Sequence, residues 1–124
     1  MDHTPTKILL VEDDESLRQA FRLLLEEFGF QVSEAGTAAE ALDAVAADLP
    51  SLVLLDLGLP DRPGLEVARE LKAAPGTRAM PVVALTGRVG AEQRRACFEA
   101  GCSAYLPKPI EARTLLRRIN EVLG

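Results

Sequence analysis

The sequence predicts an α/β fold with a doubly wound, five-stranded parallel sheet in the order 2-1-3-4-5 and five helices. Five short apolar runs alternate with five segments of helical character, and residues 51–55 are nearly all apolar, as in a strand covered on both faces. Crossovers between parallel strands are right-handed, which favours this strand order. At 124 residues the chain is expected to form one domain.

The first elements follow from apolar spacing and helix-end residues. Residues 7–11 form a buried strand, and residues 15–28 form a helix for which Asp14 is the expected N-cap and Gly29 the end. A short strand with alternating polarity follows at residues 31–35. The apolar stripe of the first helix is expected at Leu17, Ala20, Phe21, Leu24 and Phe28.

The remaining elements are bounded by glycine, proline and one capping threonine. Thr37 is the expected N-cap of a helix that ends near residue 47, and Pro75-Gly76 stops the third helix. The loop at residues 57–63 contains two prolines and a glycine, and Gly101 closes the fourth helix. The other expected elements are the central strand 51–55, the helix 64–73, the strand 81–85, the helix 91–100, the strand 104–106 and the helix 111–123.

Composition excludes several classes of protein. No segment approaches the roughly 20 apolar residues needed to cross a membrane, and the start of the chain lacks the features of a secretory signal. Cys97 and Cys102 are not spaced as a metal motif, so reduced thiols in a cytoplasmic protein are expected. The net charge of −5 argues against direct nucleic-acid binding. The charge is uneven, because residues 1–87 carry −8 and residues 88–124 carry +3.

Four polar residues stand where apolar runs end: Asp13, Asp56, Thr86 and Lys108. Because the carboxyl ends of parallel strands share one edge of a sheet, these side chains are expected to meet in one crevice. Two acids, a hydroxyl and an ammonium are suited to a metal ion and a phosphoryl group. The sequence therefore predicts a phosphoryl-binding metal site at this edge.

Longer motifs surround these residues: Leu10-Val11-Glu12-Asp13-Asp14, Leu54-Leu55-Asp56-Leu57-Gly58-Leu59-Pro60 with Gly64, Val83-Ala84-Leu85-Thr86-Gly87, and Ala104-Tyr105-Leu106-Pro107-Lys108-Pro109. In this order and spacing they resemble the receiver domain of two-component response regulators, in particular the single-domain, chemotaxis-regulator-like type. The resemblance implies a flavodoxin-like fold and a receiver domain at residues 7–124. Residues 1–6 are expected to form a flexible tail, in which His3 is not expected to donate phosphate.

The resemblance also implies the roles of the site residues. Asp56 accepts phosphate from a histidine kinase or phosphotransfer protein, with Lys108 and Thr86 as its catalytic partners. The Lys108–Pro109 bond is expected to be cis. Magnesium is the expected cofactor, held by Asp13, by Glu12 through water, by Asp56 and by the backbone carbonyl of Gly58.

Three further residues are expected to control the switch and its lifetime. Phosphate at Asp56 is expected to draw Thr86 towards it and to let Tyr105 turn inward. Gly58 places no side chain beside the phosphoryl group, whereas Arg88 is able to reach over it. As a hypothesis, Gly58 admits water and Arg88 screens it, and together they set the lifetime of the phosphorylated state.

The expected output surface is the fourth helix, fifth strand and fifth helix, which make up most of the basic part of the chain. A downstream protein is expected to bind there, although the basic residues of this surface fit an ordinary solvated helix face equally well. No output domain follows Gly124, so a stand-alone regulator or a phosphorelay intermediate is expected if the chain is complete. A receiver domain excised from a longer regulator or hybrid kinase is the alternative. The candidate contacts are Arg94, Arg95, Arg113, Arg117 and Arg118.

Competing functions fit the residues less well. A haloacid-dehalogenase-type phosphatase needs a second aspartate two residues after the first, where this chain has Gly58. A flavin carrier needs a phosphate loop rich in threonine, serine and glycine after the first strand, where this chain has three acids. A pseudo-receiver lacks the set of acids, threonine and lysine found here. We therefore expect a signalling switch that catalyses only its own phosphorylation and slow dephosphorylation, and not an independent enzyme.

Overall fold

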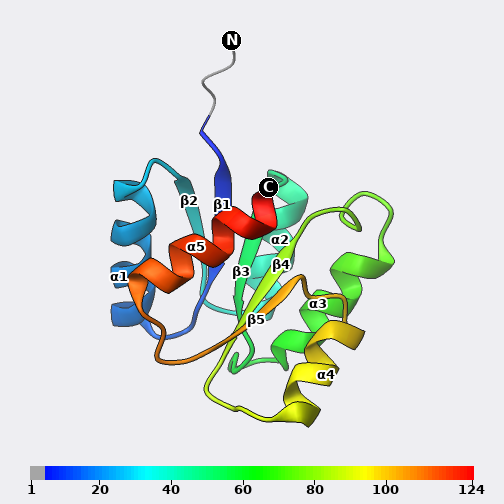
Figure 1. Cartoon of the computed structure of the whole chain (residues 1–124). Helices are drawn as coiled ribbons and strands as arrows, with labels where there is room; N and C mark the ends of the chain where they lie inside the picture. Colours follow the sequence, from blue (N-terminus) through cyan, green and yellow to red (C-terminus); the bar gives the residue numbers. More distant parts are fainter. Residues whose placement is uncertain (1–4) are drawn as a thin grey trace.

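Five parallel strands form one sheet in the order β2-β1-β3-β4-β5, as the sequence predicts. The computed structural model describes residues 5–124 (Figure 1). Its strands are β1 (Lys7–Val11), β2 (Gln31–Ala35), β3 (Leu52–Asp56), β4 (Val82–Thr86) and β5 (Ala104–Pro107). Its helices are α1 (Glu15–Glu27), α2 (Ala38–Ala47), α3 (Gly64–Ala73), α4 (Ala91–Glu99) and α5 (Ala112–Leu123). The flavodoxin-like, doubly wound architecture is confirmed.

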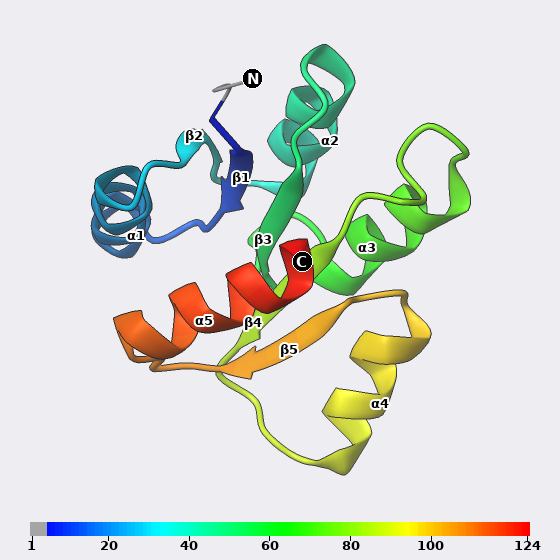
Figure 2. The same cartoon turned by 45° about the horizontal axis from the view of Figure 1, so that its top comes forward.

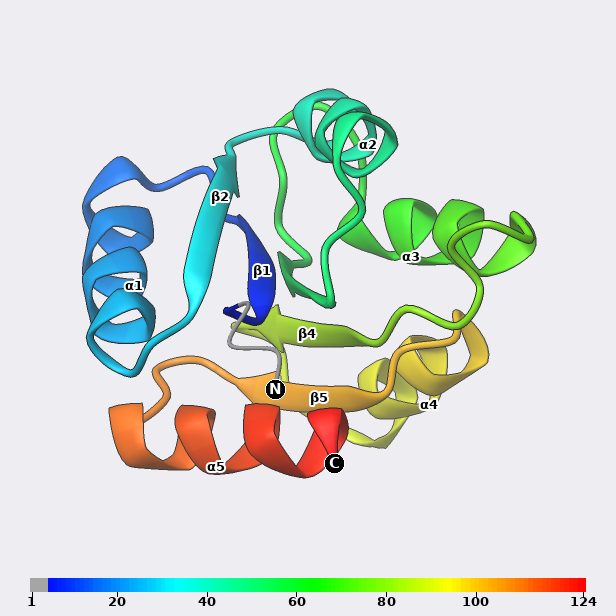
Figure 3. The same ribbon diagram turned by 90° about the horizontal axis from the view of Figure 1, so that it is seen from above.

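Helices cover both faces of the sheet and give it two cores. Helices α1 and α5 pack on one face, and α2, α3 and α4 pack on the other (Figure 3). Successive side chains of a strand point to opposite faces, so Leu9 and Val11 face one core and Ile8 and Leu10 face the other. Every residue of β3 and β4 is buried, which confirms the prediction of fully covered central strands.

The first two helices begin at the capping residues that the sequence predicts. Asp14 Oδ1 accepts a hydrogen bond from the Leu17 amide at 3.0 Å, and Thr37 Oγ1 accepts one from the Glu40 amide at 3.1 Å. The Glu40 carboxylate in turn accepts a hydrogen bond from the Gly36 amide at 2.7 Å. These bonds satisfy amides that have no partner within the helix.

The buried stripe of α1 differs from the predicted one. Leu25 is fully buried, whereas Phe28 is 60% exposed and Ala20 is also exposed. The helix ends at Glu27, and Gly29, with φ of 90°, turns the chain away. Phe28 therefore caps the helix and leaves its periodicity. The correctly predicted positions are Leu17, Phe21 and Leu24.

Strands β3 and β4 each begin and end one residue later than predicted. Asp56 and Thr86 are consequently the last residues of their strands. Asp56 is paired with Leu85 in the sheet, and Thr86 is paired with Pro107. The sheet therefore fixes the backbone of both residues, which matters for the site below.

The chain before β1 is described only in part. Residues 1–4 of the predicted tail, which include His3, lie outside the described residues. The carbonyl of Thr6 accepts a hydrogen bond from the Gln31 amide at 2.9 Å. Within residues 5–124, no helix combines the length and the apolar character that crossing a bilayer requires.

Candidate functional site

An open cleft lies at the carboxyl edge of the sheet and brings together the predicted site residues. Glu12 and Asp13 follow β1 directly, and Lys108 follows β5. Asp56 and Thr86 end the central strands β3 and β4. Residues 57–63 form one wall of the cleft. The lining includes Glu12, Asp13, Asp56, Thr86, Arg88 and Lys108.

Three carboxylates in the cleft offer a set of oxygen ligands for a cation. One oxygen from each of Glu12, Asp13 and Asp56 lies within 4.8 Å of the others. Glu12 is 1% exposed and Asp56 is 4% exposed, whereas Asp13 is open to solvent. Magnesium prefers carboxylate oxygens and keeps several waters, which an open cleft can supply. The donor set therefore fits a magnesium ion.

Lys108 lies between two of these acids. Its Nζ is 3.1 Å from Asp56 Oδ1 and 2.9 Å from Glu12 Oε1. The sequence indicated a partner at Asp56 but gave no sign of the second contact, which joins residues 96 positions apart. The Lys108–Pro109 bond is cis, which confirms that expectation. The Lys108 amide also donates to the Thr86 carbonyl at 2.7 Å, so the end of β5 is tied to the end of β4.

Burial and charge act in opposite directions on these groups. Burial raises the pKa of Glu12, and the nearby Asp56 charge adds to the rise, although Lys108 and the Asp14 amide oppose it. Burial alone lowers the pKa of Lys108, but hydrogen bonds and charges from the two acids outweigh it and raise that pKa. The lysine is thus held as a cation beside Asp56.

Thr86 and Tyr105 are both attached to the backbone of Arg88. The Arg88 amide donates a hydrogen bond to Thr86 Oγ1 at 3.0 Å, and the Tyr105 hydroxyl donates one to the Arg88 carbonyl at 2.6 Å. Thr86 is buried and Tyr105 is half-buried. A movement of the Thr86 hydroxyl therefore breaks its hydrogen bond with the Arg88 amide. Arg88 is also the residue to which Tyr105 is hydrogen-bonded, so the two side chains are linked through it.

Gly58 leaves open space beside Asp56. Its amide donates a hydrogen bond to Asp56 Oδ1 at 3.2 Å. A Cβ atom on Gly58 would lie 3.9 Å from the same oxygen, which is ordinary van der Waals contact. A side chain at this position therefore fits, and it would stand next to the acceptor carboxylate.

The predicted output surface consists of the edge strand β5 and the helices α4 and α5, which pack on opposite faces of the sheet. Figure 2 shows β5 between α4 and α5. Apolar side chains are exposed on and beside α4. Val89, in the loop before the helix, is 72% exposed, and Phe98, in its last turn, is 44% exposed. The Arg94 guanidinium carbon lies 5.7 Å from the centre of the Phe98 ring, within the range of a cation–π contact. Basic and apolar groups are thus mixed at helix α4.

Two residues near the site were not predicted. Arg18 donates a hydrogen bond to the Glu12 carbonyl at 2.8 Å, and Asp61 accepts hydrogen bonds from the first amides of α2. A basic residue in the first turns of a helix carries no distinctive sequence signal, so Arg18 was not identifiable. Asp61 stands in a loop with two prolines, where an acid is ordinary.

Sequence comparison relates the chain to one family. The sequence model of the "Response regulator receiver domain" matches residues 8–120. The response regulator MprA of Mycolicibacterium vanbaalenii is 39% identical over 119 residues, a match that covers 96% of this chain and 51% of that protein. The chain therefore spans about half the length of the curated relatives it matches.

Solved structures agree with the sequence comparison. A CheY-like response regulator receiver domain protein from Methanospirillum hungatei JF-1 superposes with a TM-score of 0.88 at 34% identity, covering 97% of this chain and 94% of that one. The chemotaxis response regulator CheY4 of Vibrio cholerae gives a TM-score of 0.91 at 26% identity, covering 96% and 99% of the two chains.

Proposed function

This chain belongs to the family of response regulator receiver domains of two-component signalling, and from that premise we propose that Asp56 is its phosphoacceptor. In this proposal residues 7–124 form the receiver domain, and a histidine kinase or phosphotransfer protein supplies the phosphoryl group. The observation that carries the proposal is a buried carboxylate that ends a buried central strand and contacts Lys108 in an open, acidic cleft. Such a group needs charged partners in the native state, and here they are ones that also suit phosphate.

In the proposed transfer, an Asp56 oxygen attacks phosphorus while the bond from phosphorus to the histidine nitrogen breaks. The bonding electron pair leaves with the imidazole, and an acyl phosphate remains. Nucleophile and phosphoryl group are both anionic, so positive charge must be in place beforehand. Magnesium held by Glu12, Asp13, Asp56 and the Gly58 carbonyl supplies part of that charge when bound. Lys108 supplies the rest, and the Thr86 hydroxyl donates a hydrogen bond to a phosphoryl oxygen.

The signal then passes through Thr86 to the surface of α4, β5 and α5. Thr86 leaves the Arg88 amide when it turns towards the phosphoryl group, and the loop after β4 moves with it. In the structure, the Tyr105 hydroxyl is hydrogen-bonded to the Arg88 carbonyl. After the switch Tyr105 turns inward into the space that Thr86 and the loop have left. The equilibrium between two states of this surface thereby shifts. A downstream protein binds the arginines of the shifted surface: Arg94, Arg95, Arg113, Arg117 and Arg118.

The proposed protein is a signalling switch that turns over only its own phosphate. It acts in the cytoplasm through protein contacts, without binding nucleic acid through this domain. Because the chain spans about half the length of its curated relatives, a receiver domain of a longer regulator or hybrid kinase is the main alternative to a single-domain regulator. A phosphorelay intermediate is the other. Pull-down with phosphorylated and unphosphorylated protein separates a state-dependent partner from simple phosphate transfer.

The decisive experiment is incubation with magnesium and acetyl phosphate, with intact-protein mass spectrometry as the readout. We expect the wild type to gain the mass of one phosphoryl group and Asp56→Asn to gain none. Omitting magnesium or adding EDTA should abolish the gain. A wild type that stays unmodified, or an Asp56→Asn variant that is modified equally well, contradicts the proposal.

A further inference from the structure

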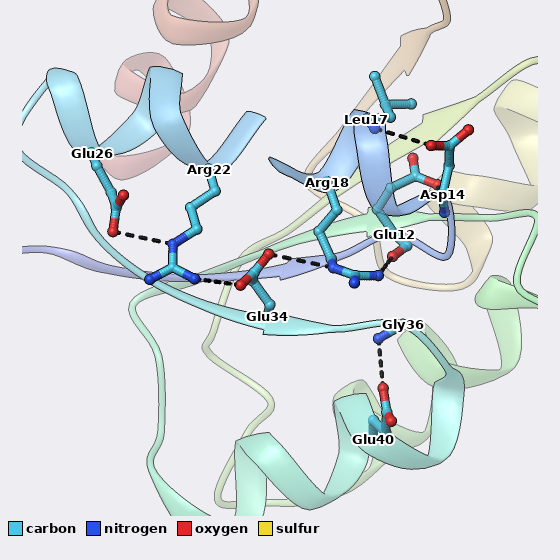
Figure 4. A network of polar contacts seen from close by, with 9 residues as sticks. All are labelled: Glu12, Asp14, Leu17, Arg18, Arg22, Glu26, Glu34, Gly36 and Glu40. Atoms are coloured by element: carbon cyan, nitrogen blue, oxygen red, sulfur yellow. Dashed lines mark hydrogen bonds and ion pairs between the residues drawn. The ribbon is translucent and has the colours of Figure 1, made fainter. Parts of the chain in front are cut away.

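Arg18 connects helix α1 to the turn that carries two of the acids. Its Nη1 donates a hydrogen bond to the Glu12 carbonyl at 2.8 Å, and its Nε lies 3.3 Å from Glu34 Oε1 on β2 (Figure 4). The Arg18 side chain is only 23% exposed. The guanidinium is therefore held from two sides, and one of its contacts is to the backbone of the cleft.

This contact completes the hydrogen bonding of Glu12. The Glu12 amide donates to the Ala35 carbonyl at 3.0 Å, and its Oε2 accepts a hydrogen bond from the Asp14 amide at 3.1 Å. Its other carboxylate oxygen contacts Lys108. The remaining polar group is the carbonyl, which Arg18 holds. The Glu12 carbonyl and the Asp13 amide belong to one peptide plane, so fixing the carbonyl also fixes the direction in which Asp13 leaves the chain.

A second feature keeps the arginine charge from opposing a cation in the cleft. Glu34 lies between Arg18 and Arg22, and Arg22 Nη1 is 2.5 Å from Glu34 Oε2 (Figure 4). Arg22 also pairs with Glu26 at 3.3 Å. The Glu34 carboxylate offsets much of the Arg18 charge, since it lies in direct contact with the guanidinium. Arg18 thus supplies a directed hydrogen bond with little net repulsion.

The chain leaves room for the guanidinium at Gly36. A Cβ atom on Gly36 would lie 3.2 Å from Arg18 Nη1 and 3.9 Å from the Glu12 carbonyl oxygen. The first distance is tighter than most real contacts, so a side chain at this position would press directly on the arginine. Figure 4 shows Gly36 close to the Arg18 guanidinium, at the start of the chain that leads into α2.

We propose that Arg18 is a positioning residue for the metal-binding acids Glu12 and Asp13. It acts by holding the Glu12 peptide, and it does not touch the metal or the phosphoryl group. This inference rests on the proposed function, because it assumes that these acids bind magnesium. Partners behind metal ligands commonly contribute about 10-fold to 100-fold in affinity.

The test is magnesium affinity, measured on the full chain by isothermal titration calorimetry. We expect Arg18→Ala to raise the dissociation constant about tenfold. Arg18→Lys, which keeps a donor and the charge, should recover part of the loss. Arg22→Ala is the matched control. Arg22 lies on the same helix and also pairs with Glu34, but it makes no contact with Glu12. Its dissociation constant should stay within about twofold of the wild type, a margin well below the effect expected of a metal-ligand partner.

A second readout separates positioning from a general loss of structure. With EDTA present, thermal unfolding should show similar midpoints for Arg18→Ala and Arg22→Ala, and the initial rate of acetyl phosphate labelling should recover at saturating magnesium. Gly36→Val offers an independent perturbation if Arg18→Ala does not fold, and it too should weaken magnesium binding.

The outcomes distinguish the two proposals. Equal magnesium affinity in the wild type and in folded Arg18→Ala overturns the positioning role and leaves the phosphoacceptor proposal intact. A tenfold loss in Arg22→Ala as well overturns it too, because the effect would then be one of helix charge. A wild type that binds no magnesium overturns both proposals together.

Discussion

Lys108 determines how much negative charge the cleft can hold without a cation. Three carboxylates lie within 4.8 Å of one another, and one ammonium contacts two of them. The cluster therefore carries excess negative charge whenever the acids are ionised. This repulsion destabilises the folded state and lowers the free energy of unfolding, as is common at functional sites.

Neutralising one acid should therefore stabilise the protein in the absence of metal. We expect Asp13→Asn to raise the free energy of unfolding by about 1 kcal/mol in EDTA. Asp13 is exposed, and like charges at this separation repel by about that amount where the dielectric is close to that of water. The same variant should lose the stabilisation that millimolar magnesium gives the wild type. Urea unfolding with and without magnesium measures both effects.

The control for this prediction is the neighbouring acid. Asp14 caps α1 through its side chain, and asparagine is an equally good cap. Asp14→Asn should therefore keep the stabilisation by magnesium. If Asp13→Asn is stabilised by magnesium as strongly as the wild type, Asp13 is not a ligand.

The lifetime of the phosphorylated state should depend on the two residues beside the acceptor. Gly58→Leu places an apolar side chain next to Asp56, where a Cβ atom makes only ordinary van der Waals contact, and it should slow the loss of phosphate by excluding water. Arg88→Ala removes the residue proposed to screen the phosphoryl group and should speed the loss. We expect changes of about threefold to tenfold, equivalent to roughly 0.7–1.4 kcal/mol in the barrier. Phosphate release after removal of the donor measures the half-life, and unchanged half-lives in both variants contradict the hypothesis.

At the scale of elements, Asp61 links the loop after β3 to helix α2. Its Oδ1 accepts a hydrogen bond from the Ala38 amide at 2.9 Å, and its Oδ2 accepts one from the Ala39 amide at 3.1 Å. The Ala38 amide, followed by that of Ala39, lowers the pKa of Asp61 despite partial desolvation. Together with Thr37, this acid satisfies the amides at the start of α2.

This contact should make the stability of the protein depend on pH in a defined direction. Because the pKa of Asp61 is lower in the folded than in the unfolded protein, its contribution is present above about pH 3.9, the ordinary value for aspartate, and is lost at lower pH. Asp61→Ala should therefore be less stable than the wild type at pH 7, and the gap should narrow below pH 4.

Denaturant unfolding across this pH range provides the measurement for Asp61. Asp43→Ala serves as the control, because Asp43 is an exposed acid in the middle of the same helix. If the difference in free energy of unfolding between wild type and Asp61→Ala stays constant from pH 7 to pH 3, the ionised Asp61 carboxylate is not the source of the stabilisation.

The elements themselves were largely predictable, and the exceptions have local causes. Apolar periodicity located every strand and helix, but it placed Phe28 in the core of α1, where the structure exposes it. The helix ends before that position at a glycine with positive φ, and spacing alone does not show where a cap interrupts the period. The ends of β3 and β4 moved by one residue because sheet pairing, and not polarity, decides where a strand ends.

The site was predictable only for residues whose position in the sequence, directly after an apolar run, puts them at the carboxyl end of a strand. Asp13, Asp56, Thr86 and Lys108 each follow an apolar run, so the topology alone predicts that they meet. The pairing of Lys108 with Glu12 and the contact from Arg18 to the Glu12 carbonyl depend on side-chain directions across elements. No periodicity in the sequence encodes such directions.

For the molecule as a whole, two buried thiols report on opening of the fold. Cys97 is fully buried and Cys102 is 5% exposed. Burial raises the pKa of Cys102 to about 12, with a further contribution from Cys97. At pH 8 the thiolate fraction of Cys102 is therefore about a thousandfold lower than that of an ordinary cysteine.

Labelling by a thiol reagent at pH 8 should accordingly be at least a thousandfold slower for Cys102 in the native protein than in urea. Its rate should follow the free energy of opening as denaturant is added. Mass spectrometry of peptides from timed samples distinguishes Cys102 from Cys97. Rapid labelling of Cys102 without denaturant contradicts the buried position.

The same raised pKa predicts a loss of stability in alkali. The unfolded chain releases the thiol proton near pH 8.5, whereas the folded chain holds it to about pH 12, so stability falls as pH rises between these values. Cys102→Ala should show a shallower decline from pH 8.5 to pH 10 than the wild type. Equal slopes would rule out this source of alkaline sensitivity.

The division of the sheet into two edges has a practical consequence for protein engineering. Every residue assigned to the cleft lies at the carboxyl end of a strand or just after it. The connections that lead into the amino ends of the strands are residues 28–30, 48–51, 74–81 and 100–103. Insertions at that far edge leave the strand registers, and hence the cleft, in place. A single deletion inside β3, by contrast, would exchange the two cores and turn Asp56 away from its neighbours. Fluorescent labels, affinity tags or new domain junctions therefore belong at residues 74–81, the longest of these connections.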